Sequence, residues 1–443
     1  MTLLDTKNKS AIDITKIVEI SSLSEMTGKE VVIRGWVHRH RDSTENAFVV
    51  VRDGTGTVQA VISKTEVSPE SWKNAAEVYT ESVVLVSGKV MKDPRSPTGI
   101  EIKASKFETT FQGEPFPIGK DQSIEFLLDQ RHLWVRSTRI VDALKIKATL
   151  MKACRDFLDE RGFLEIQPPL MTQSACEGGN ELFEINYFGG KAYLSQSGQL
   201  YSEAMIAGYP RVYVFAPSFR AEPSRTPRHL TEFWQLEPEM AFYDQKMNME
   251  LQEEMVEFFC HTIAKKNSDI LKKFDRDPRD LLSINAPFEQ MTYEKAISKL
   301  QDQGLSIKWG DGIGLDEEKL LVKEYTQPVF LMNQPKEFRP FYMKTNPNDP
   351  RTVLDADLLA PEGIGEIIGG SERVSDYDDL MHNLAEKKLN PTDYEWYINL
   401  RKYGSVPHSG FGMGAERVIR WLLKLDSIRD AIPFPRTINR VKP

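Results

Sequence analysis

Residues 219–242, FRAEPSRTPRHLTEFWQLEPEMAF, combine aromatic, acidic and basic side chains at short spacing. If EFWQLEPEMAF forms a strand, its side chains alternate, so that Phe233, Glu237 and Glu239 lie on one face and apolar residues on the other. The apolar set is typical of a core face. An aromatic ring beside two carboxylates is suited instead to the floor of a polar pocket, which makes this face the first candidate for a ligand site.

The loop before this strand carries three basic side chains, Arg225, Arg228 and His229. The preceding strand, VYVFAPSFRAE, ends in Arg220 and Glu222, and an antiparallel hairpin would place both beside the pocket floor. Scattered charges on a solvated hairpin are the plainer interpretation of such a segment. A long hairpin loop rich in cations is usually functional, however, which favours a site for an anionic ligand.

A second candidate lies in YGSVPHSGFGMGAERVIRWLLKL, residues 403–425. Gly410, Gly412 and Gly414 leave a strand with little side chain, as is needed where a flat ligand or another backbone approaches closely. Arg417 falls in the first turn of the helix that follows, where the helix dipole disfavours a cation. An anionic ligand beside Arg417 would account for this placement.

Two nucleotide-binding fingerprints are excluded here. Gly410, Gly412 and Ala415 fit a loose dinucleotide motif, but that motif opens a βαβ unit, and only residues 416–443 remain. No GxxxxGK[ST] sequence occurs in the chain, so a P-loop is absent. His408, beside the glycines, either touches a substrate or caps the strand, and the pattern does not decide between the two.

A third candidate is ADLLAPEGIGEIIGGSERVSDYDDL, residues 356–380. Asp357 and Glu366 carry the oxygen ligands that a hard divalent cation prefers, and the glycines near them leave space. Arg373 follows these glycines. Carboxylates on a glycine-rich loop also occur in solvated turns, so both interpretations stay open.

The elements that must position these residues form two regions. Residues 31–110 contain short β-rich runs separated by Asp-Gly and Gly, which predicts a small all-β barrel of the OB-fold kind. Residues 113–123, rich in Gly and Pro, are typical of a linker. Farther on, helical periodicity at 138–161 and irregularly alternating strands and helices predict an α+β domain with a largely antiparallel sheet.

The helix predicted at 138–161 has one apolar face. Its members are Ile140, Leu144, Lys147, Met151, Cys154 and Leu158. Gly162 stands where a helix C-cap is expected. This face serves either an internal core or a subunit contact.

The composition limits the class of protein. The chain has 443 residues, 40% of them hydrophobic and 28% charged, which is enough for two or three domains of a soluble globular protein. Because no signal-peptide pattern and no apolar run long enough to span a bilayer occur, we expect a cytoplasmic protein without a membrane partner. Three well-separated cysteines fit a reducing cytosol. With a net charge of −8, any nucleic acid must be held by a local basic patch.

Together these segments resemble the motifs of class II aminoacyl-tRNA synthetases. FRAE…RHLTEFWQLEPEM resembles motif 2 of that family, GFGMGAER resembles motif 3, and the helix with GFLEIQPPLM resembles motif 1. The barrel, IIGGSERV and IPFPRT are similar to the aspartyl, asparaginyl and lysyl subgroup. The resemblance covers nearly the whole chain and implies an OB-fold anticodon-binding domain at 1–112, a hinge at 113–135 and an α+β catalytic domain on an antiparallel sheet at 136–443.

The resemblance also implies an ATP site that needs no side-chain nucleophile, because the carboxylate of the amino acid attacks the α-phosphate. Its residues are expected to be Arg220, Glu222, Arg228, His229, Leu230, Phe233, Glu366, Gly414, Glu416 and Arg417. Arg220 at the α-phosphate and Arg417 on adenine and the γ-phosphate would be catalytic, with Phe233 on the other face of adenine. Asp357 and Glu366 would bind Mg²⁺ that bridges the phosphates.

One departure within the subgroup bears on the substrate. Aspartyl members carry QSPQLYKQ, whose lysine meets the side-chain carboxylate of aspartate, whereas this chain has QSGQLYSE, with Ser202 at the lysine position. Arg373 would donate to the amide oxygen of asparagine, and Glu237 would accept from its NH₂ group while repelling aspartate. Glu177 and Gln199 would receive the α-amino group. The resemblance thus implies asparagine as the substrate and tRNA(Asn) as the acceptor.

In the barrel, Phe48 and Gln59 match the anticodon-contacting pair of the subgroup. A Phe in a barrel strand is more often a core residue. The basic run RGWVHRHR, which contains Arg34, Arg39 and Arg41, favours base stacking with phosphate contacts instead.

Three alternatives stay open at this point. The first is an aspartyl enzyme, including one that charges both tRNA(Asp) and tRNA(Asn), and Ser202 argues against it. The second is a relative that makes free asparagine from aspartate through an adenylate, which would not need a complete barrel. The third is a tRNA-binding paralogue without catalysis, which the full set of ATP-site residues disfavours. A homodimer is expected from the resemblance.

Overall fold

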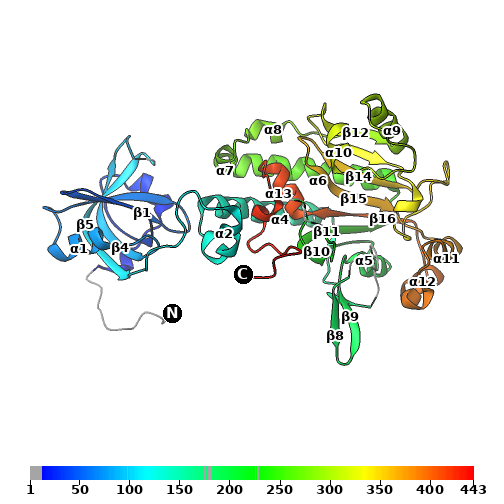
Figure 1. The fold of residues 1–443 in the computed structure, drawn as a ribbon, viewed down its shortest axis with the longest axis horizontal. Helices are drawn as coiled ribbons and strands as arrows, with labels where there is room; N and C mark the ends of the chain where they lie inside the picture. Colours follow the sequence, from blue (N-terminus) through cyan, green and yellow to red (C-terminus); the bar gives the residue numbers. More distant parts are fainter. Residues whose placement is uncertain (1–11, 97, 174–175, 177–181, 225, 227–228) are drawn as a thin grey trace. The chain divides into compact units, whose positions relative to one another are not determined.

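The computed structural model describes residues 12–96, 98–173, 176, 182–224, 226 and 229–443 (Figure 1). The chain divides into two compact units, Met1–Ile124 and Glu125–Pro443. The division falls within the segment 113–135, whose second half forms helices α2 (Ile124–Asp129) and α3 (Arg131–Trp134). Arg131 is buried in the second unit, where its guanidinium donates to three backbone carbonyls, those of Arg429, Ile432 and Pro433.

The first unit is a closed five-stranded barrel with the strand order β1-β2-β3-β5-β4. Its strands are β1 (Glu30–Asp42), β2 (Asn46–Arg52), β3 (Thr57–Ser63), β4 (Val83–Lys92) and β5 (Ile100–Phe111), and its helix is α1 (Pro69–Glu77). Alternate residues of each strand, such as Val49 and Val51, are fully buried and fill the barrel. The prediction of a small all-β barrel is confirmed.

The second unit is built on an eight-stranded sheet with the order β12-β13-β14-β15-β16-β11-β10-β6. Its strands are β6 (Leu164–Glu165), β10 (Arg211–Phe219), β11 (Glu232–Ala241), β12 (Glu289–Thr292), β13 (Val329–Met332), β14 (Asp355–Ala360), β15 (Gly365–Glu372) and β16 (His408–Gly414). Neighbouring strands are antiparallel except in the pairs β12–β13 and β6–β10, so the predicted antiparallel α+β domain is confirmed. A separate small sheet contains β7 (Met171–Thr172), β8 (Glu184–Tyr187) and β9 (Gly190–Leu194).

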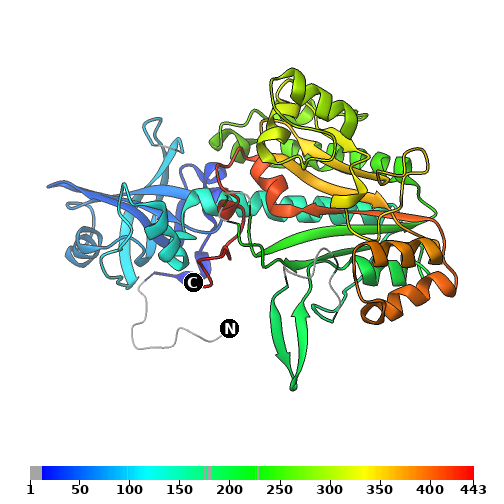
Figure 2. The same ribbon diagram turned by 45° about the vertical axis from the view of Figure 1, so that its right-hand side comes forward.

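Three helices cover one face of the large sheet (Figure 2). They are α4 (Thr138–Glu160), α6 (Gln245–Lys266) and α13 (Ala415–Leu422), and their buried residues form one core with the central strands. The other helices are α5 (Gln199–Met205), α7 (Ser268–Lys273), α8 (Pro278–Leu282), α9 (Tyr293–Asp302), α10 (Leu315–Val322), α11 (Tyr377–Glu386) and α12 (Glu395–Lys402). None of the helices in the described part of the chain is long and apolar enough to cross a membrane.

Helix α4 begins and ends close to the predicted positions, and most of its predicted apolar face is buried. Ser137 caps the N-terminus, and Gly162 follows the end with a φ of 73°, a backbone conformation that favours glycine. Four members of the predicted face, Ile140, Lys147, Cys154 and Leu158, are buried, and the half-buried Met151 packs against the core. Leu144 is only half-buried. The buried face is wider than predicted, because Ala143, Ile146, Leu150, Ala153 and Phe157 are buried as well.

Candidate active site

The antiparallel hairpin β10–β11 forms the floor of the site, as its sequence predicts. On β11, Leu236 and Met240 point into the core beneath the sheet, so Glu237 and its alternate neighbours lie on the opposite face. Phe233 lies near the beginning of this strand. The backbone N–H of Arg220, just beyond β10, donates to the carbonyl of Thr231 at 3.0 Å, which places Arg220 beside Phe233.

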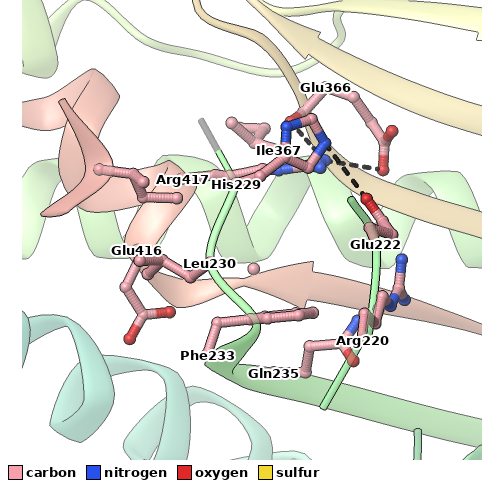
Figure 3. A pocket seen from close by; sticks show the side chains of 13 residues that line it. Arg220, Glu222, His229, Leu230, Phe233, Gln235, Glu366, Ile367, Glu416 and Arg417 are labelled. Carbon is pink, nitrogen blue, oxygen red and sulfur yellow. Dashed lines mark hydrogen bonds and ion pairs between the residues drawn. The ribbon is translucent and has the colours of Figure 1, made fainter. Parts of the chain in front are cut away.

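A cavity above this floor is bounded by the hairpin, by β15 and β16, and by the start of α13 (Figure 3). Its lining residues are Arg220, Glu222, His229, Leu230, Phe233, Gln235, Glu366, Ile367, Gly412, Gly414, Glu416, Arg417 and Ile428. Phe233 and Arg417 therefore share one cavity, and in Figure 3 the ring of Phe233 lies below the Arg417 side chain. The structure brings together all the residues predicted for ATP except Arg228, which lies outside the described residues.

Two contacts between oppositely charged side chains of this cavity are long. Arg417 Nη1 lies 3.4 Å from Glu366 Oε1, and His229 Nε2 lies 3.4 Å from Glu222 Oε2. The guanidinium of Arg220 lies 5.4 Å from the centroid of the Phe233 ring. Because the Arg417–Glu366 ion pair is partly exposed to water, it stabilises the fold by only about 0–1 kcal/mol. A phosphate group can therefore replace the carboxylate partner of Arg417 with little loss of stability.

Glu416 lines the same cavity but is tied into the framework around it. Its side chain is 1% exposed. Oε1 accepts from Nζ of Lys147 in α4 at 2.5 Å, and Oε2 accepts from the backbone N–H of Trp234 at 3.0 Å. These bonds connect α13 to α4 and to the floor strand, and so they orient the turn from which Arg417 extends.

A second cavity adjoins the first, and four residues line both: Arg220, Gln235, Glu366 and Gly412. The other lining residues are Ser197, Gln199, Glu237, Glu239, Arg339, Pro340, Tyr342, Met343, Asp357, Gly369, Arg373 and Phe411. The lining of the second cavity, with the four shared residues included, contains three arginines and four acidic side chains. This lining suits a small, highly polar ligand rather than an apolar one.

Arg373 and Glu239 form a buried two-point ion pair in the second cavity. Arg373 donates from Nε to Glu239 Oε1 at 3.1 Å and from Nη2 to Oε2 at 3.0 Å. Burial alone would lower the pKa of Arg373, but the Glu239 carboxylate outweighs it and holds this pKa above its usual range. A Cβ atom on Gly410 would lie 2.0 Å from Glu239 Oε2, so β16 can pass this pair only with glycine at that position.

Glu237 is held by the segment that leads into α5. Its Oε2 accepts from the backbone N–H of Gly198 at 2.9 Å, and its Oε1 accepts from the hydroxyl group of Ser197. Gln199, the first residue of α5, donates from Nε2 to Glu203 at 3.0 Å. The structure thus places three of the residues predicted to bind the amino acid, Gln199, Glu237 and Arg373, in one cavity.

The remaining residues predicted to bind the amino acid have other positions. Ser202 is fully buried, and its hydroxyl donates to the carbonyl of Gly198 at 3.3 Å; it lines neither cavity. Glu177 lies outside the described residues. His408, whose role the sequence left open, is buried, with Nδ1 at 2.7 Å from the carbonyl of Val406 and Nε2 at 3.0 Å from Glu203.

Asp357 and Glu366 face a common space beside Gly369. A Cβ atom on Gly369 would lie 3.3 Å from both Asp357 Oδ1 and Glu366 Oε1. Two carboxylate oxygens around one point form a donor set that fits Mg²⁺. Burial raises the pKa of Asp357 to about 7, with Arg339 opposing the rise and Glu366 and Asp355 adding to it. A cation bound here would offset the cost of burying this carboxylate and the repulsion from its acidic neighbours.

The sequence patterns did not point to Arg339 or Tyr342, which also line the second cavity. Arg339 bridges two acidic residues of β14, with Nε at 2.7 Å from Asp355 Oδ2 and Nη2 at 2.6 Å from Asp357 Oδ1. The Arg373 guanidinium lies 5.3 Å from the centroid of the Tyr342 ring. Both residues belong to EFRPFYMK, which has neither a periodic pattern nor a turn signal. The only signal in this segment that could have pointed to the site is an arginine among aromatic residues shortly before an acidic strand.

On the barrel, Phe48 lies on the outer face and not in the core. Its neighbours Ala47 and Val49 are fully buried inside, whereas Phe48 is half-buried. The Arg41 guanidinium lies 4.9 Å from the centroid of its ring. An aromatic ring on the outside of an OB-fold, next to a cation, is the arrangement that stacks a nucleic-acid base.

The other predicted anticodon residues lie on the same barrel. Arg39 of β1 and Gln59 of β3 are both paired with Val50 of β2, so these residues form a row across the outer face that carries Phe48. Gln59 donates from Nε2 to Glu101 at 3.3 Å. Arg34 is exposed on β1 farther from this row, opposite Leu85 of β4, which is buried.

Two family models match the chain. One, described as tRNA synthetases class II (D, K and N), matches residues 123–438, and the other, an OB-fold nucleic acid binding domain, matches residues 31–110. The asparagine–tRNA ligase of Thermococcus gammatolerans is 48% identical over 95% of this chain and 97% of that protein. The asparagine–tRNA ligase of Thermoplasma acidophilum is 45% identical over 96% of this chain and 99% of that protein.

Solved structures show the same likeness. The crystal structure of asparaginyl-tRNA synthetase from Pyrococcus horikoshii complexed with asparaginyl-adenylate has a TM-score of 0.92 and 45% identity, with coverage of 95% of this chain and 97% of that one. A putative aspartyl-tRNA synthetase from Leishmania major is less similar in sequence, with a TM-score of 0.87, 26% identity and coverage of 99% and 97% of the two chains.

The chain combines a closed OB-fold barrel with a largely antiparallel sheet that carries two adjoining polar cavities. This combination and the family match identify it as a class II aminoacyl-tRNA synthetase. Within that class, the chain belongs to the family of tRNA synthetases for aspartate, lysine and asparagine. The resemblance predicted from its three motifs is confirmed.

Proposed function

We propose that the protein attaches asparagine to tRNA(Asn). Asparagine and ATP first form asparaginyl-adenylate with release of diphosphate, and the asparaginyl group then passes to the terminal ribose of the tRNA. The observation that carries this proposal is the junction of the two cavities at Arg220: one suits a nucleotide, and the other suits a small polar amino acid. Sequence identity of 44–48% to proteins named asparagine–tRNA ligase supports the choice of amino acid.

In the first cavity, adenine lies between the ring of Phe233 and the guanidinium of Arg417, which also reaches the γ-phosphate. Glu222 and His229 contact the nucleotide. Arg220 holds the α-phosphate at the junction, where the carboxylate of the amino acid attacks. Because negative charge grows on the α-phosphoryl oxygens during this attack, a guanidinium fixed there stabilises the transition state more than the ground state.

Mg²⁺ is proposed to accompany ATP and to be held by Asp357 and Glu366. The support is the facing pair of carboxylate oxygens beside Gly369. When bound, the cation neutralises charge on the polyphosphate. Arg339, bonded to Asp357, keeps that carboxylate in place.

In the second cavity, Arg373 donates to the side-chain amide oxygen of asparagine, and Glu237 accepts from the amide NH₂. Gln199 and Glu177 receive the α-amino group. A side-chain carboxylate in place of the amide would face Glu237 in a cavity where acidic side chains outnumber arginines by four to three. Selectivity for asparagine therefore has an attractive and a repulsive component.

The test of this proposal is ATP–pyrophosphate exchange with asparagine and with aspartate, measured side by side on the intact protein. We expect exchange with asparagine and at least about 100-fold less with aspartate, because a pocket built for one polar group rejects an analogue that leaves its partners mismatched. Equal exchange with both amino acids would indicate an aspartyl enzyme of relaxed specificity. Exchange with neither would indicate a tRNA-binding paralogue.

Ser202→Lys tests the position that distinguishes this chain from aspartyl relatives. We expect exchange with asparagine to fall roughly tenfold or more, because the added cation brings a charge that favours a carboxylate over an amide. Ser202 is fully buried, so steric effects must be separated from charge. Ser202→Met adds similar length without charge, and an equal loss in both variants would remove charge from the explanation.

Phe48→Ala tests the barrel surface. We expect the KM for tRNA to rise roughly tenfold to 100-fold, because stacking of a base on an aromatic ring is worth about 1–3 kcal/mol, while asparagine-dependent exchange without tRNA stays unchanged. Phe111→Ala, which removes an exposed ring from β5, is the matched control and should leave the KM for tRNA unchanged. Equal losses in exchange and in tRNA charging would mean that Phe48 stabilises the fold.

We also propose a homodimer in the cytoplasm, with an anticodon-binding domain at 1–112, a hinge at 113–135 and a catalytic domain at 136–443. Support for a reducing compartment comes from Cys154, Cys176 and Cys260, which are free thiols. Sedimentation equilibrium of the intact protein measures the oligomeric state.

A further inference from the structure

A buried hydrogen-bonded network centred on Glu203 of α5 adjoins the amino-acid cavity. Glu203 Oε2 accepts from Arg401 Nη2 and from the hydroxyl of Tyr397, both at 2.6 Å, and His408 Nε2 lies 3.0 Å away. Glu203 Oε1 accepts from Gln199 Nε2 at 3.0 Å. All five side chains are buried, and of the five only Gln199 lines the cavity.

The carboxyl group of Glu203 is ionised in this setting. Burial by itself would favour the neutral acid, but the charge of Arg401 and the contact with His408 outweigh burial and hold the pKa of Glu203 well below its usual range. An ionised carboxylate accepts hydrogen bonds and cannot donate them. Gln199 must therefore present its NH₂ group, and not its oxygen, to Glu203.

This constraint fixes the polarity of the cavity wall. The two ends of a glutamine amide differ, since the oxygen accepts and the NH₂ donates, so a bond from Nε2 to Glu203 leaves Oε1 for the cavity. Among the residues that the structure describes, none donates to Gln199 Oε1. Donation to a carboxylate also polarises the amide and makes its oxygen a stronger acceptor. Such an acceptor suits a cationic donor such as a primary ammonium group.

We propose that Glu203 is a positioning residue for amino-acid binding: it holds the Gln199 amide with its oxygen toward the cavity, where that oxygen accepts from the substrate ammonium group. The identity of the substrate rests on the function proposed above. Glu203 itself does not touch the substrate, and it acts through Gln199.

Glu203→Gln should reverse the orientation of Gln199. The Arg401 and Tyr397 donors on the Oε2 side require the oxygen of the new amide. Its NH₂ group then replaces Oε1 and faces Gln199, and two NH₂ groups cannot bond to each other. Gln199 turns its oxygen inward and its NH₂ toward the cavity, where that NH₂ opposes an ammonium group.

The experiment compares asparagine with succinamic acid, which is asparagine without its amino group, in the intact protein. For Glu203→Gln we expect the KM for asparagine in ATP–pyrophosphate exchange to rise on the order of 10- to 100-fold, the range for a lost hydrogen bond to a charged group. The Ki of succinamic acid and the KM for ATP should stay within about threefold. Tyr397→Phe removes a different donor from Glu203 and leaves the Gln199 bond intact. It should therefore change the KM for asparagine and the Ki of succinamic acid by no more than about threefold.

An equal weakening of asparagine and succinamic acid in Glu203→Gln would show a structural role and overturn the proposal, and so would an unchanged KM for asparagine. If Glu203→Gln does not fold, as judged by its Tm, Gln199→Leu tests the contact through which Glu203 is proposed to act, because it removes the acceptor of the ammonium group and leaves the charged network in place. Loss of asparagine binding with retained succinamic acid binding supports the proposal, and parallel changes overturn it. Wild-type protein without asparagine-dependent exchange would instead overturn the function proposed above.

Discussion

Replacing Arg220 by alanine is expected to lower the rate of asparagine-dependent ATP–pyrophosphate exchange on the order of 1,000-fold. Arg220 lines both cavities, so its guanidinium lies where the nucleotide and the amino acid meet. The loss should fall on kcat more than on KM, because charge on the α-phosphate grows as the new bond forms. Steady-state exchange with asparagine and ATP each varied separates the two constants.

Two further variants show whether the guanidinium itself is responsible. Arg211→Ala removes an exposed arginine at the other end of the same strand, β10, and should leave exchange unchanged. Arg220→Lys keeps the charge but not the planar fork that binds two phosphoryl oxygens, so it should give an intermediate loss. If Arg220→Ala keeps exchange within about tenfold of wild type at an unchanged Tm, Arg220 does not act on the reacting phosphate.

The sequence predicted the floor of the site because local patterns determine it. Alternation along EFWQLEPEMAF assigns Glu237 and Leu236 to opposite faces whatever the rest of the chain does, and the structure has them there. The close packing at Gly410 was also predictable from a local pattern. A strand rich in glycine predicts that another group approaches its backbone closely, and here that group is the Glu239 carboxylate. The register of the hairpin then follows from the pairing of its two strands.

The sequence could not predict contacts that depend on segments far apart in the chain. Arg339 meets Asp355 and Asp357 across a loop without periodicity, so no pattern linked them. Glu203 and Arg401 are separated by 198 residues, and their bond exists only once α5 and α12 have packed together. The buried positions of Ser202 and Glu203 could not be predicted for the same reason, although Ser202 had already distinguished this segment from that of aspartyl relatives.

Glu237→Gln is expected to raise the activation of aspartate by up to about 1,000-fold and so to lower the selectivity for asparagine over aspartate. Glutamine keeps the shape of Glu237 but removes its charge. At an effective dielectric constant of 20, two unit charges 4 Å apart repel by about 4 kcal/mol, which sets the upper limit of the effect on aspartate. Activation of asparagine should fall roughly 10- to 100-fold, because a charge-assisted hydrogen bond becomes a neutral one.

The surroundings of Glu237 make this substitution informative. The backbone N–H of Gly198 can only donate, so the oxygen of the new amide must face it, and its NH₂ must face Ser197, whose hydroxyl can turn to accept. The fold is therefore retained and the change is electrostatic. Glu232→Gln, on the same strand but outside both cavities, is the control and should leave both activities unchanged. If Glu237→Gln weakens asparagine while aspartate remains as poor a substrate as before, repulsion by Glu237 is not what excludes aspartate, and the exclusion must come from the other charges of the cavity.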